Sequence, residues 1–568
     1  RARQAAQELV TRPAEFPPPF RTADYVAAPS DPPEERIEVG VLIVGAGPAG
    51  LACAIRLGQL LEDAPEIRER LGEVPVAILE KGKQAGSHLM SGAVVNPRAL
   101  QRLFKGRKRL DEMPFYGPVE HESVYFLTQK SALRIPAPPT MRNEGNYVAS
   151  LSRLGRWLAE QAEEAGAMLL PETAAEKLLV ADGRARGVRT GDKGRGRDGQ
   201  PLGNFEPGSD LVAKVTVLAE GTQGHLTGVA LDRFGLAGEN PQVWALGVKE
   251  VWKVKRPLDR VIHTMGWPLR PAAKYREFGG SFIYPMGEDM LTLGMVVGLD
   301  YRDVELSVHD LLQELKTHPL VRKLLDGGAR VAWGAKTIPE GGFLALPKQL
   351  HAPGLLIAGD GAGLVNVPAL KGIHYAIESG RLAAETAFGS LQRGQTPATP
   401  GALAGYDDAL RQSFVWKDLQ EVRNMRPAFG RGFFIGGALA GAMTATKGRF
   451  PRRDLELERD ADVDLVRTDR ATSYPAPDGK LTFDKLSSVF ASGNKTRDDQ
   501  PNHIVIQREV PQDIALLWER MCPAQVYEAT ENGVDVTPSN CVQCGAITAK
   551  GGRLTPPEGG SGPEYTLT

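Results

Sequence analysis

The chain has 568 residues, of which 42% are hydrophobic and 24% are charged, and its formal net charge is -1 at pH 7. This length exceeds one hydrophobic core and predicts two or three domains, and the balanced charge argues against a general nucleic-acid binder, because no basic excess is available to neutralise phosphates. Four cysteines are too few for a secreted disulfide framework, which favours a reducing compartment.

The N-terminal segment differs in composition from the rest of the chain. Residues 1–37 are rich in proline, alanine, arginine and glutamate and include three consecutive prolines at 17–19. Such a composition favours an extended segment over a packed unit. We therefore predict an arm over residues 1–37 that lies on the surface.

A strand, a glycine-rich turn and a helix follow in the pattern of a dinucleotide site. Residues 41–44 are apolar and mostly β-branched, and a helical pattern begins after the glycines. In such a turn Gly45 allows a sharp reversal, Gly47 lets the backbone approach a pyrophosphate, and Gly50 lets the helix pack closely on the strand. The free N–H groups at the start of the helix, around Ala49, suit phosphate oxygens.

A second strand brings an acidic residue to the same site. Residues 74–79 are apolar and are followed by Glu80, whose carboxylate suits a ribose 2′-hydroxyl. The polar insert at residues 62–73 makes the spacing longer than usual. The loop after Glu80 supplies the remaining residues of this half that we expect near the dinucleotide, which are Lys81, Ser91 and Gly92.

Two interpretations are open for the next stretch. A basic cluster at residues 105–109 precedes the apolar residues 113–116 and the strand-like run 124–127. One interpretation is a solvated loop before a hairpin. The other is a membrane-facing hairpin whose apolar tip, near Phe115, enters the lipid interface while the basic side chains meet headgroups.

An α/β pattern then gives way to strands. Residues 151–165 have apolar side chains at helical spacing, and the strand-like residues 215–218 run into Ala219, Glu220 and Gly221, a sequence that suits close approach to a cofactor. Four strand-like runs follow, at residues 245–254, 262–267, 279–284 and 290–297. We predict that these runs form an antiparallel sheet in a second domain, which covers the cofactor and shapes a substrate site.

A second cofactor signature lies some three hundred residues after the first. Residues 355–358 form an apolar strand that ends in Gly359 and Asp360, and a helical pattern covers residues 374–391. The Asp360 carboxylate can accept a hydrogen bond from a ribityl hydroxyl, and a helix start near Gly372 can stabilise negative charge on a reduced isoalloxazine. Paired with the first fingerprint, this signature favours FAD over NAD.

A glycine-rich apolar segment follows a polar helix at residues 415–424. Residues 432–446 carry no charge and are too few to span a bilayer, and no other apolar run is long enough to do so. Basic residues flank the segment on both sides, which suits anionic headgroups at about 1 kcal/mol per basic residue. A buried core helix is the alternative, but we favour a monotopic membrane anchor because the apolar run and the basic cluster adjoin.

Three of the four cysteines lie near the C-terminus. Cys541 and Cys544 form a C-x-x-C pair after Cys522, an arrangement that resembles an iron–sulfur loop. The fourth ligand is expected at position 547, which is Ile547. The remaining cysteine, Cys53, lies in the nucleotide-binding helix and is most simply a small packed residue.

These motifs together resemble one known family along most of the chain. The similarity is to electron transfer flavoprotein–ubiquinone oxidoreductases, and it rests on ordered, specific stretches between about residues 38 and 565. The stretches include residues 44–51, 145–147, 266–269, 279–282, 297–301, 340–343, 366–368, 473–475, 499–501, 522–528 and 557–560.

The resemblance implies an α/β fold, α+β overall. It combines an FAD-binding fold of the two-dinucleotide-binding type with an inserted antiparallel-sheet quinone domain and a C-terminal ferredoxin-like domain. The expected parts are an FAD domain (residues 38–115, 145–240 and 335–425), a quinone-binding domain with the hairpin (116–144 and 241–334), an amphipathic monotopic segment (426–454) and the iron–sulfur domain (455–568).

The resemblance also implies a function. Reduced electron transfer flavoprotein would deliver electrons through FAD to a membrane quinone, ubiquinone or menaquinone, bound near the backbone of Gly279 and Gly280. It names no catalytic acid or base. The protein would sit on a bilayer surface, either the cytoplasmic face of a bacterial inner membrane or the matrix side of the mitochondrial inner membrane.

Two features keep alternatives open. With only Cys522, Cys541 and Cys544, the centre could be a 4Fe-4S cluster with a non-cysteine or solvent ligand, a three-iron cluster, or absent. The Gly359-Asp360-Gly361 loop matches the general flavoprotein pattern better than this family's usual loop. An FAD-dependent lipid reductase or hydroxylase of the geranylgeranyl reductase type shares the flavin signatures but not the cysteine block. A membrane-attached flavin-binding scaffold without electron transfer is the non-enzyme alternative.

Overall fold

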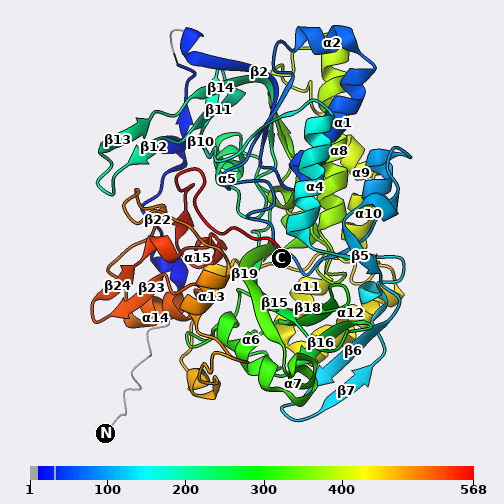
Figure 1. Cartoon of the computed structure of the whole chain (residues 1–568), viewed down its shortest axis with the longest axis vertical. Helices are drawn as coiled ribbons and strands as arrows, with labels where there is room; N and C mark the ends of the chain where they lie inside the picture. The colour runs from blue at the N-terminus through cyan, green and yellow to red at the C-terminus, as the bar shows by residue number, and fades with distance from the viewer. Residues whose placement is uncertain (1–10, 31–32) are drawn as a thin grey trace.

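The computed structural model describes residues 11–30 and 33–568, which form three parts that meet around the C-terminal residues (Figure 1). The part of the predicted arm at residues 1–10 and 31–32 lies outside the described residues. Residues 11–30 run from the C-terminal part, where Arg12 pairs with Asp464, to the nucleotide-type sheet, where β1 (Val26–Ala27) pairs with β10. Most side chains of residues 11–30 are partly or fully exposed, and Pro13 is buried.

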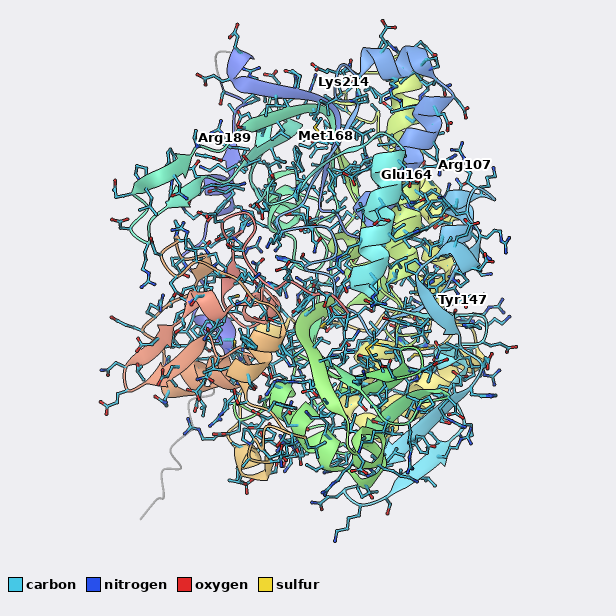
Figure 2. All side chains as sticks on the ribbon, viewed as in Figure 1. Arg107, Tyr147, Glu164, Met168, Arg189 and Lys214 are labelled. Carbon is cyan, nitrogen blue, oxygen red and sulfur yellow. The ribbon has the colours of Figure 1, made fainter. Side chains whose placement is uncertain are left out.

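The first part is built on a mainly parallel sheet. Its strands run in the order β1, β10 (Ala175–Ala181), β11 (Arg184–Thr190), β14 (Asp210–Leu218), β2 (Arg36–Val44), β3 (Val76–Leu79) and β9 (Met168–Leu170). The short strands β20 (His351–Ala352) and β21 (Leu355–Ile357) extend it beside β14. Met168, Arg189 and Lys214, labelled in Figure 2, mark β9, β11 and β14. The glycine-rich stretch at 190–210 contains a separate hairpin of β12 (Lys193–Arg195) and β13 (Pro201–Glu206).

Helices cover this sheet because their apolar sides bury against it. α1 (Pro48–Glu62) packs against both α8 (Ile373–Gln392) and α4 (Leu151–Glu164), and the three run side by side in Figure 1. α5 (His225–Arg233) packs on β10, and α2 (Pro65–Arg70) and α3 (Arg98–Phe104) adjoin α1. The polar insert at residues 62–73 therefore contains the short helix α2.

The parallel register sets where the strands end. Val44 of β2 lies opposite Leu79 of β3 and Leu218 of β14, and Leu218 lies opposite Ile357 of β21. Because the carboxyl ends of parallel strands meet at one edge, the segments that follow these four strands come together there.

The second part is a seven-stranded sheet. Its order is β19 (Ala329–Pro339), β15 (Trp244–Lys253), β18 (Met290–Gly298), β17 (Gly279–Pro285), β16 (Val261–Gly266), β6 (Glu122–Leu127) and β7 (Ala132–Ile135). The pairs are antiparallel, as predicted, except that β16 and β6 are parallel. α6 (Val308–Thr317) packs on β15 and β18, and α7 (Pro319–Leu325) adjoins α6.

The hairpin expected around Phe115 differs in the structure. Phe115 begins β5 (Phe115–Pro118), which pairs with β8 (Tyr147–Ala149) in a small sheet completed by β4 (Val94–Val95). Its ring lies against that of Tyr147, with the ring centroids 5.0 Å apart; Figure 2 labels Tyr147. The hairpin of this region is instead β6–β7, so Phe115 is a packing residue rather than an exposed tip.

A run of short helices follows α8. It comprises α9 (Gly405–Gln412), α10 (Phe414–Glu421), α11 (Met425–Ala428) and α12 (Phe433–Ala445). α12 lies beside β6, since Phe126 is 5.7 Å from Phe433 and 6.4 Å from Phe434 between ring centroids. Phe434 and Ile435 are 67% and 58% exposed. The charges of this segment lie at its ends, so α12 is apolar all round rather than amphipathic. No helix among the described residues has both the length and the apolar character needed to cross a bilayer.

The third part is the C-terminal domain. α13 (Lys485–Ala491), α14 (Gln512–Met521) and α15 (Ala546–Ala549) surround two short sheets, β22 (Ile504–Val505) with β25 (Arg553–Leu554) and β23 (Tyr527–Thr530) with β24 (Gly533–Val536). Its core is continuous with that of the seven-stranded sheet, whereas the nucleotide-type part has a core of its own.

Candidate functional site

A cavity of about 940 Å³ runs between the three parts. Its walls include the strand ends of the first part, one face of the seven-stranded sheet, α12 and the loop that carries Cys541 and Cys544. Every predicted cofactor residue except Gly50 lines it, as do Gly279 and Gly280. The sites that the sequence predicted separately therefore share one space.

The glycine-rich turn after β2 forms one end of the cavity. Gly45 has φ of +106°, and a Cβ there would lie 2.4 Å from the carbonyl oxygen of Ala219. A Cβ at Gly47 would meet only Leu89, at 3.9 Å, so this backbone faces open space. A Cβ at Gly50 would lie 2.0 Å from the Gly45 carbonyl oxygen, which explains why Gly50 shapes the turn without lining the cavity. The turn leaves the first N–H groups of α1 free for an anion.

Glu80 lies beside this turn at the end of β3. Its carboxylate accepts hydrogen bonds from the backbone N–H groups of Gly82, at 2.7 Å, and Ala46, at 3.2 Å. Burial raises the pKa of Glu80, although these N–H groups and Lys81 oppose the shift. A carboxylate has about four acceptor positions, so two remain for hydroxyl groups of a ligand.

The distal signature closes the cavity from the other side. Gly359 and Asp360 follow β21, and Gly372 directly precedes α8. Burial raises the pKa of Asp360 to about 6. Ser91, Gly92 and Gly221 complete this region of the wall. Together with the first turn, these residues can hold an extended dinucleotide between two helix N-termini.

One face of the seven-stranded sheet forms the middle of the cavity. Gly279 has φ of +156°, and Cβ atoms at Gly279 and Gly280 would lie 2.0 and 2.5 Å from the carbonyl oxygens of Val296 and Thr264. Only glycine fits this part of β17, and both glycines line the cavity. α12 also lines the cavity, with Phe433, Gly437, Ala440, Gly441 and Thr444, which share one side of the helix.

Sequence reasoning missed three lysines in this wall, of which Lys249 and Lys371 are buried and Lys336 is partly exposed. Lys249 Nζ donates to the Ser91 carbonyl oxygen at 2.7 Å, Lys371 Nζ to Asn143 Oδ1 at 2.9 Å, and Lys336 Nζ to the Gln543 carbonyl oxygen at 3.0 Å. Burial lowers the pKa of Lys249 to about 7 and those of Lys336 and Lys371 to about 8. These lysines lie in apolar strands or loops, and no sequence pattern distinguishes them. Only the folded structure shows that they line one cavity.

His263 and Tyr284 were missed as well. His263 Nε2 lies 2.7 Å from the Tyr284 hydroxyl, and both side chains line the cavity. The two-residue period of a strand was the available signal, because it places Tyr284 on the same face as Gly280.

The three cysteines lie in the C-terminal core beside the cavity. Cys522 Sγ accepts a hydrogen bond from the N–H of Val526 at 3.4 Å, and Cys541 Sγ from that of Gln543 at 3.3 Å. Burial, with smaller contributions from the other thiols, raises the pKa of Cys541. Burial and the charge of Cys522 likewise raise the pKa of Cys544 to about 12. Cys522 and Cys541 belong to one hydrophobic core, and Cys544 packs against it.

The donor set does not complete a four-cysteine centre. Ile547, three residues after Cys544, is 3% exposed and has no ligand atom. In the part of the chain that the structure describes, no three His, Cys, Asp or Glu side chains are arranged to hold a single metal ion. A cluster of several irons spreads its ligands more widely, and three thiolates fit three of its four corners.

The cysteine loop also contacts the cavity wall. Thr337 donates from its N–H and its hydroxyl to the Cys544 carbonyl oxygen, both at 2.8 Å. Gln543 and Gly545 line the cavity together with Lys336 and Gln223. Redox groups held at the two places would therefore be separated by a few side chains.

Two family models match the chain. Residues 244–338 match the model described as ETF-QO, ubiquinone-binding, and residues 479–566 match the electron transfer flavoprotein-ubiquinone oxidoreductase 4Fe-4S model.

Full-length relatives carry the same name. The mitochondrial electron transfer flavoprotein-ubiquinone oxidoreductase of Arabidopsis thaliana is 39% identical over 95% of this chain and 86% of its own length. The probable electron transfer flavoprotein-ubiquinone oxidoreductase of Acinetobacter baylyi is 37% identical over 94% of this chain and 98% of its own. A geranylgeranyl bacteriochlorophyll reductase-like protein of Thermoplasma acidophilum, 18% identical, superposes with a TM-score of 0.55 over 73% of this chain and 92% of its own, which shows a shared fold.

Proposed function

Since this chain belongs to the electron transfer flavoprotein–ubiquinone oxidoreductase family, we propose that it carries electrons from reduced electron transfer flavoprotein to ubiquinone in a membrane, releasing quinol. The observation that carries the proposal is the shared cavity. Its wall joins the dinucleotide turn, the glycine strand β17, the apolar helix α12 and the cysteine loop.

The residues at the strand ends fit FAD. The turn at Gly45 and Gly47 would receive the pyrophosphate at the start of α1, Glu80 the adenosine ribose, and Asp360 the ribityl chain. The start of α8 after Gly372 would place a partial positive charge toward the flavin ring. When bound, FAD supplies the chemistry that links one-electron and two-electron transfer. The chain positions it and keeps water out.

The cysteine block fits an iron–sulfur centre with three protein ligands. We assign Cys522, Cys541 and Cys544 as its ligands. Because Ile547 has no donor atom, the fourth iron would either be bound by a solvent ligand or be absent. Backbone N–H groups directed at the Cys522 and Cys541 sulfurs would stabilise their negative charge.

The α12 side of the molecule fits a bilayer surface. Leu133, Phe434, Ile435 and Phe450 expose 65%, 67%, 58% and 46% of their surface there. Basic residues flank α12 at Arg431 and in the segment from Lys447 to Arg453. A monotopic protein bound through this face would receive quinone from the lipid along the cavity wall that α12 forms.

Kinetics with the two candidate reductants tests the function. We expect reduced electron transfer flavoprotein to reduce a ubiquinone analogue through this protein, and NAD(P)H to leave the bound flavin oxidised. Direct bleaching by NAD(P)H, without quinone reduction by the flavoprotein, would instead indicate a reductase or hydroxylase of the geranylgeranyl reductase type.

A further inference from the structure

A lysine lies where the nucleotide side of the cavity meets the cysteine loop. Lys336 Nζ donates to the carbonyl oxygen of Gln543 at 3.0 Å, and Gln543 stands between the two cysteines of the C-x-x-C pair. The next residue of β19, Thr337, holds the same loop through the hydrogen bonds from its N–H and its hydroxyl to the Cys544 carbonyl oxygen. β19 therefore fixes the place of the Lys336 ammonium relative to the loop.

The ammonium acts on the thiols of this loop. Burial raises the pKa of Cys544, and the charge of Lys336 opposes this rise. Burial also lowers the pKa of Lys336 to about 8, and Cys544 and Cys541 oppose this lowering more strongly than Glu80 does. The side chain of Lys336 is therefore mainly charged at pH 7. Lys81, which also lines the cavity, opposes the burial-driven rise in the pKa of Cys541 in the same way.

The same ammonium acts on the nucleotide side of the cavity. Burial raises the pKa of Asp360, and Lys336 is the charge that opposes this rise. Asp360, Glu80 and Lys336 all line the cavity, as does Gln543 of the cysteine loop. One cation is thus within electrostatic reach of both places that can hold a redox group.

The surroundings of the cysteines make such a charge necessary. Cys522 and Cys541 belong to an apolar core, which disfavours any additional negative charge. The backbone N–H groups directed at their sulfurs offset part of this cost. Lys336 adds a full positive charge on the Cys544 side of the loop, which faces the cavity.

We propose that the charge of Lys336 raises the reduction potential of the iron–sulfur centre held by Cys522, Cys541 and Cys544. The proposal rests on the function and the centre proposed above. One electron from the reduced flavoprotein adds one negative charge to the centre, and this step forms or breaks no bond in the protein and requires no proton. A fixed cation in a site of low dielectric constant stabilises the added charge.

The test is a redox titration of the full-length holoprotein without oxygen, followed by paramagnetic resonance. In Lys336→Met we expect the equilibrium constant for one-electron reduction of the centre to fall at least about tenfold, which is a shift of about 59 mV to more negative potential. Lys336→Arg keeps the charge and should hold this constant within about threefold of wild type. The iron and FAD contents of both variants should equal those of the wild-type protein.

Two further variants serve as controls. Lys348→Met removes the same charge from an exposed position, where water and salt screen it, so the potential should not change. Lys336→Gln keeps a hydrogen-bond donor for the Gln543 carbonyl oxygen without the charge. It should therefore show the same negative shift as Lys336→Met.

The outcomes separate the claims. An unchanged potential in Lys336→Met with iron retained would overturn the proposal, and so would an equal shift in Lys336→Arg, because charge would then not be responsible. Loss of iron or FAD from both Lys336→Met and Lys336→Gln would make Lys336 an anchor of the loop or of the flavin, which also overturns it. A wild-type protein without iron would overturn the centre and the proposal together. If the potential shifts as expected but the wild-type protein does not reduce a ubiquinone analogue with reduced electron transfer flavoprotein, only the proposed function is wrong.

Discussion

Two features of the backbone require glycine at position 45. Its φ of +106° is a conformation that side chains rarely adopt, and the Ala219 carbonyl oxygen occupies the place of a Cβ. A non-glycine residue in the left-handed conformation costs about 1–2 kcal/mol. We expect Gly45→Ala to lower the free energy of unfolding by more than this, because the Cβ would also clash with the Ala219 carbonyl oxygen. The protein should also be purified with little FAD, as measured by its absorbance.

Gly72→Ala provides the control for this prediction. Gly72 has φ of +89°, but nothing lies within 4 Å of its Cβ position. In this variant the free energy of unfolding should fall only because of the unfavourable backbone conformation, and the protein should keep its FAD. Equal loss of flavin in both variants would show that strain alone, and not the close approach at the turn, controls binding.

The missing fourth ligand gives a second test at the residue scale. Ile547 occupies the position at which a cysteine is expected, and it is buried in the same core as Cys541. We expect Ile547→Cys to raise the iron content to about four per FAD and to make the fourth iron resistant to loss on oxidation. The measurement is the content of iron and acid-labile sulfide in anaerobically purified protein, together with its paramagnetic-resonance spectrum.

A neighbouring substitution controls for the added thiol. Ala549→Cys places a buried cysteine in the same short helix, two positions further on, and should leave the iron content unchanged. If Ile547→Cys holds no more iron than the parent protein, position 547 does not reach the cluster and the assignment of the ligand loop is wrong.

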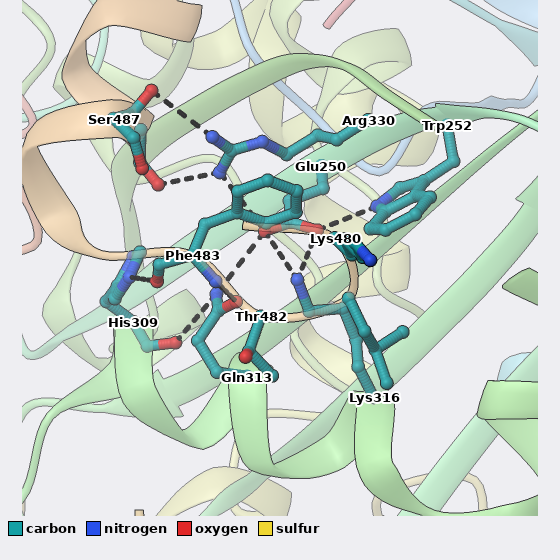
Figure 3. Close-up of polar contacts among 12 residues, drawn as sticks. Glu250, Trp252, His309, Gln313, Lys316, Arg330, Lys480, Thr482, Phe483 and Ser487 are labelled. Atoms are coloured by element: carbon teal, nitrogen blue, oxygen red, sulfur yellow. Dashed lines mark hydrogen bonds and ion pairs between the residues drawn. The ribbon is translucent and has the colours of Figure 1, made fainter. Parts of the chain in front are cut away.

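At the scale of elements, a buried ion cluster ties α6 to the back of the seven-stranded sheet (Figure 3). Glu250 on β15 pairs with Lys316 on α6, with Nζ at 2.9 and 2.8 Å from the two carboxylate oxygens. Trp252 Nε1 donates to the same carboxylate at 2.7 Å, and Arg330 lies 3.6 Å away. Strand alternation turns Glu250 away from the cavity that Lys249 faces.

Breaking this cluster should be costly. Glu250→Gln leaves Lys316 buried without its counter-charge, so we expect the free energy of unfolding to fall by about 3–5 kcal/mol in urea titrations. Glu250→Gln combined with Lys316→Met should recover much of the loss. If the double variant is as unstable as the single one, shape rather than charge is responsible.

The cluster also sets a pH dependence. Burial alone would raise the pKa of Glu250, but Lys316 and Arg330 outweigh it, so the folded pKa is lowered. The stabilisation that ionised Glu250 gives to the folded state is therefore fully present above the pKa of the unfolded chain, about 4.3. It is lost as the pH falls through the lowered pKa of the folded state. In Glu250→Gln this part of the acid destabilisation should be missing.

Elements with local signals could be predicted from the sequence, whereas long-range pairings could not. The fingerprint strand and helix, the strands around residues 245–297 and the helix after Gly372 have clear periodicity, and their predicted bounds are within a few residues of those observed. The parallel β16–β6 pair joins residues far apart in the chain, and Phe115 pairs with β8 across some thirty residues. Neither pairing leaves a pattern within one segment. The lysines of the cavity were missed for the same reason, since only the fold brings them together.

The exposed apolar helix α12 makes a prediction about membrane binding. Phe434 is 67% exposed, and inserting it in lipid would gain up to about 1.5–3 kcal/mol. We expect Phe434→Glu to lower the fraction bound to anionic phospholipid vesicles about tenfold in sedimentation assays, with FAD content unchanged. Met168→Glu is the control, because Met168 is 47% exposed on β9, which belongs to the nucleotide-type sheet and lies away from α12 (Figures 1 and 2). Equal losses in both variants would exclude α12 as the contact.

At the scale of the whole molecule, two groups of exposed apolar residues lie at separate places. One is the α12 side, and the other is α13 on the C-terminal domain, where Leu486 and Phe490 are 48% and 89% exposed (Figure 1). α13 borders a groove whose lining includes Asn540, the residue before Cys541. The cavity is lined both by α12 and by the cysteine loop, so electrons entering beside the cysteines would pass to a quinone entering at α12 within one continuous space.

This arrangement predicts where the partner flavoprotein docks. With a net charge of -1 the protein offers little long-range steering, so short-range apolar contacts beside the cysteine loop should dominate recognition. We expect Phe490→Ser to raise the KM for reduced electron transfer flavoprotein about tenfold, equivalent to about 1.4 kcal/mol, with kcat, quinone KM and iron content unchanged. Ile37→Ser, which alters a 48% exposed side chain on β2, should leave every constant unchanged. An unaltered partner KM in Phe490→Ser would place docking elsewhere, and electron entry would then not be directed by the apolar surface of α13.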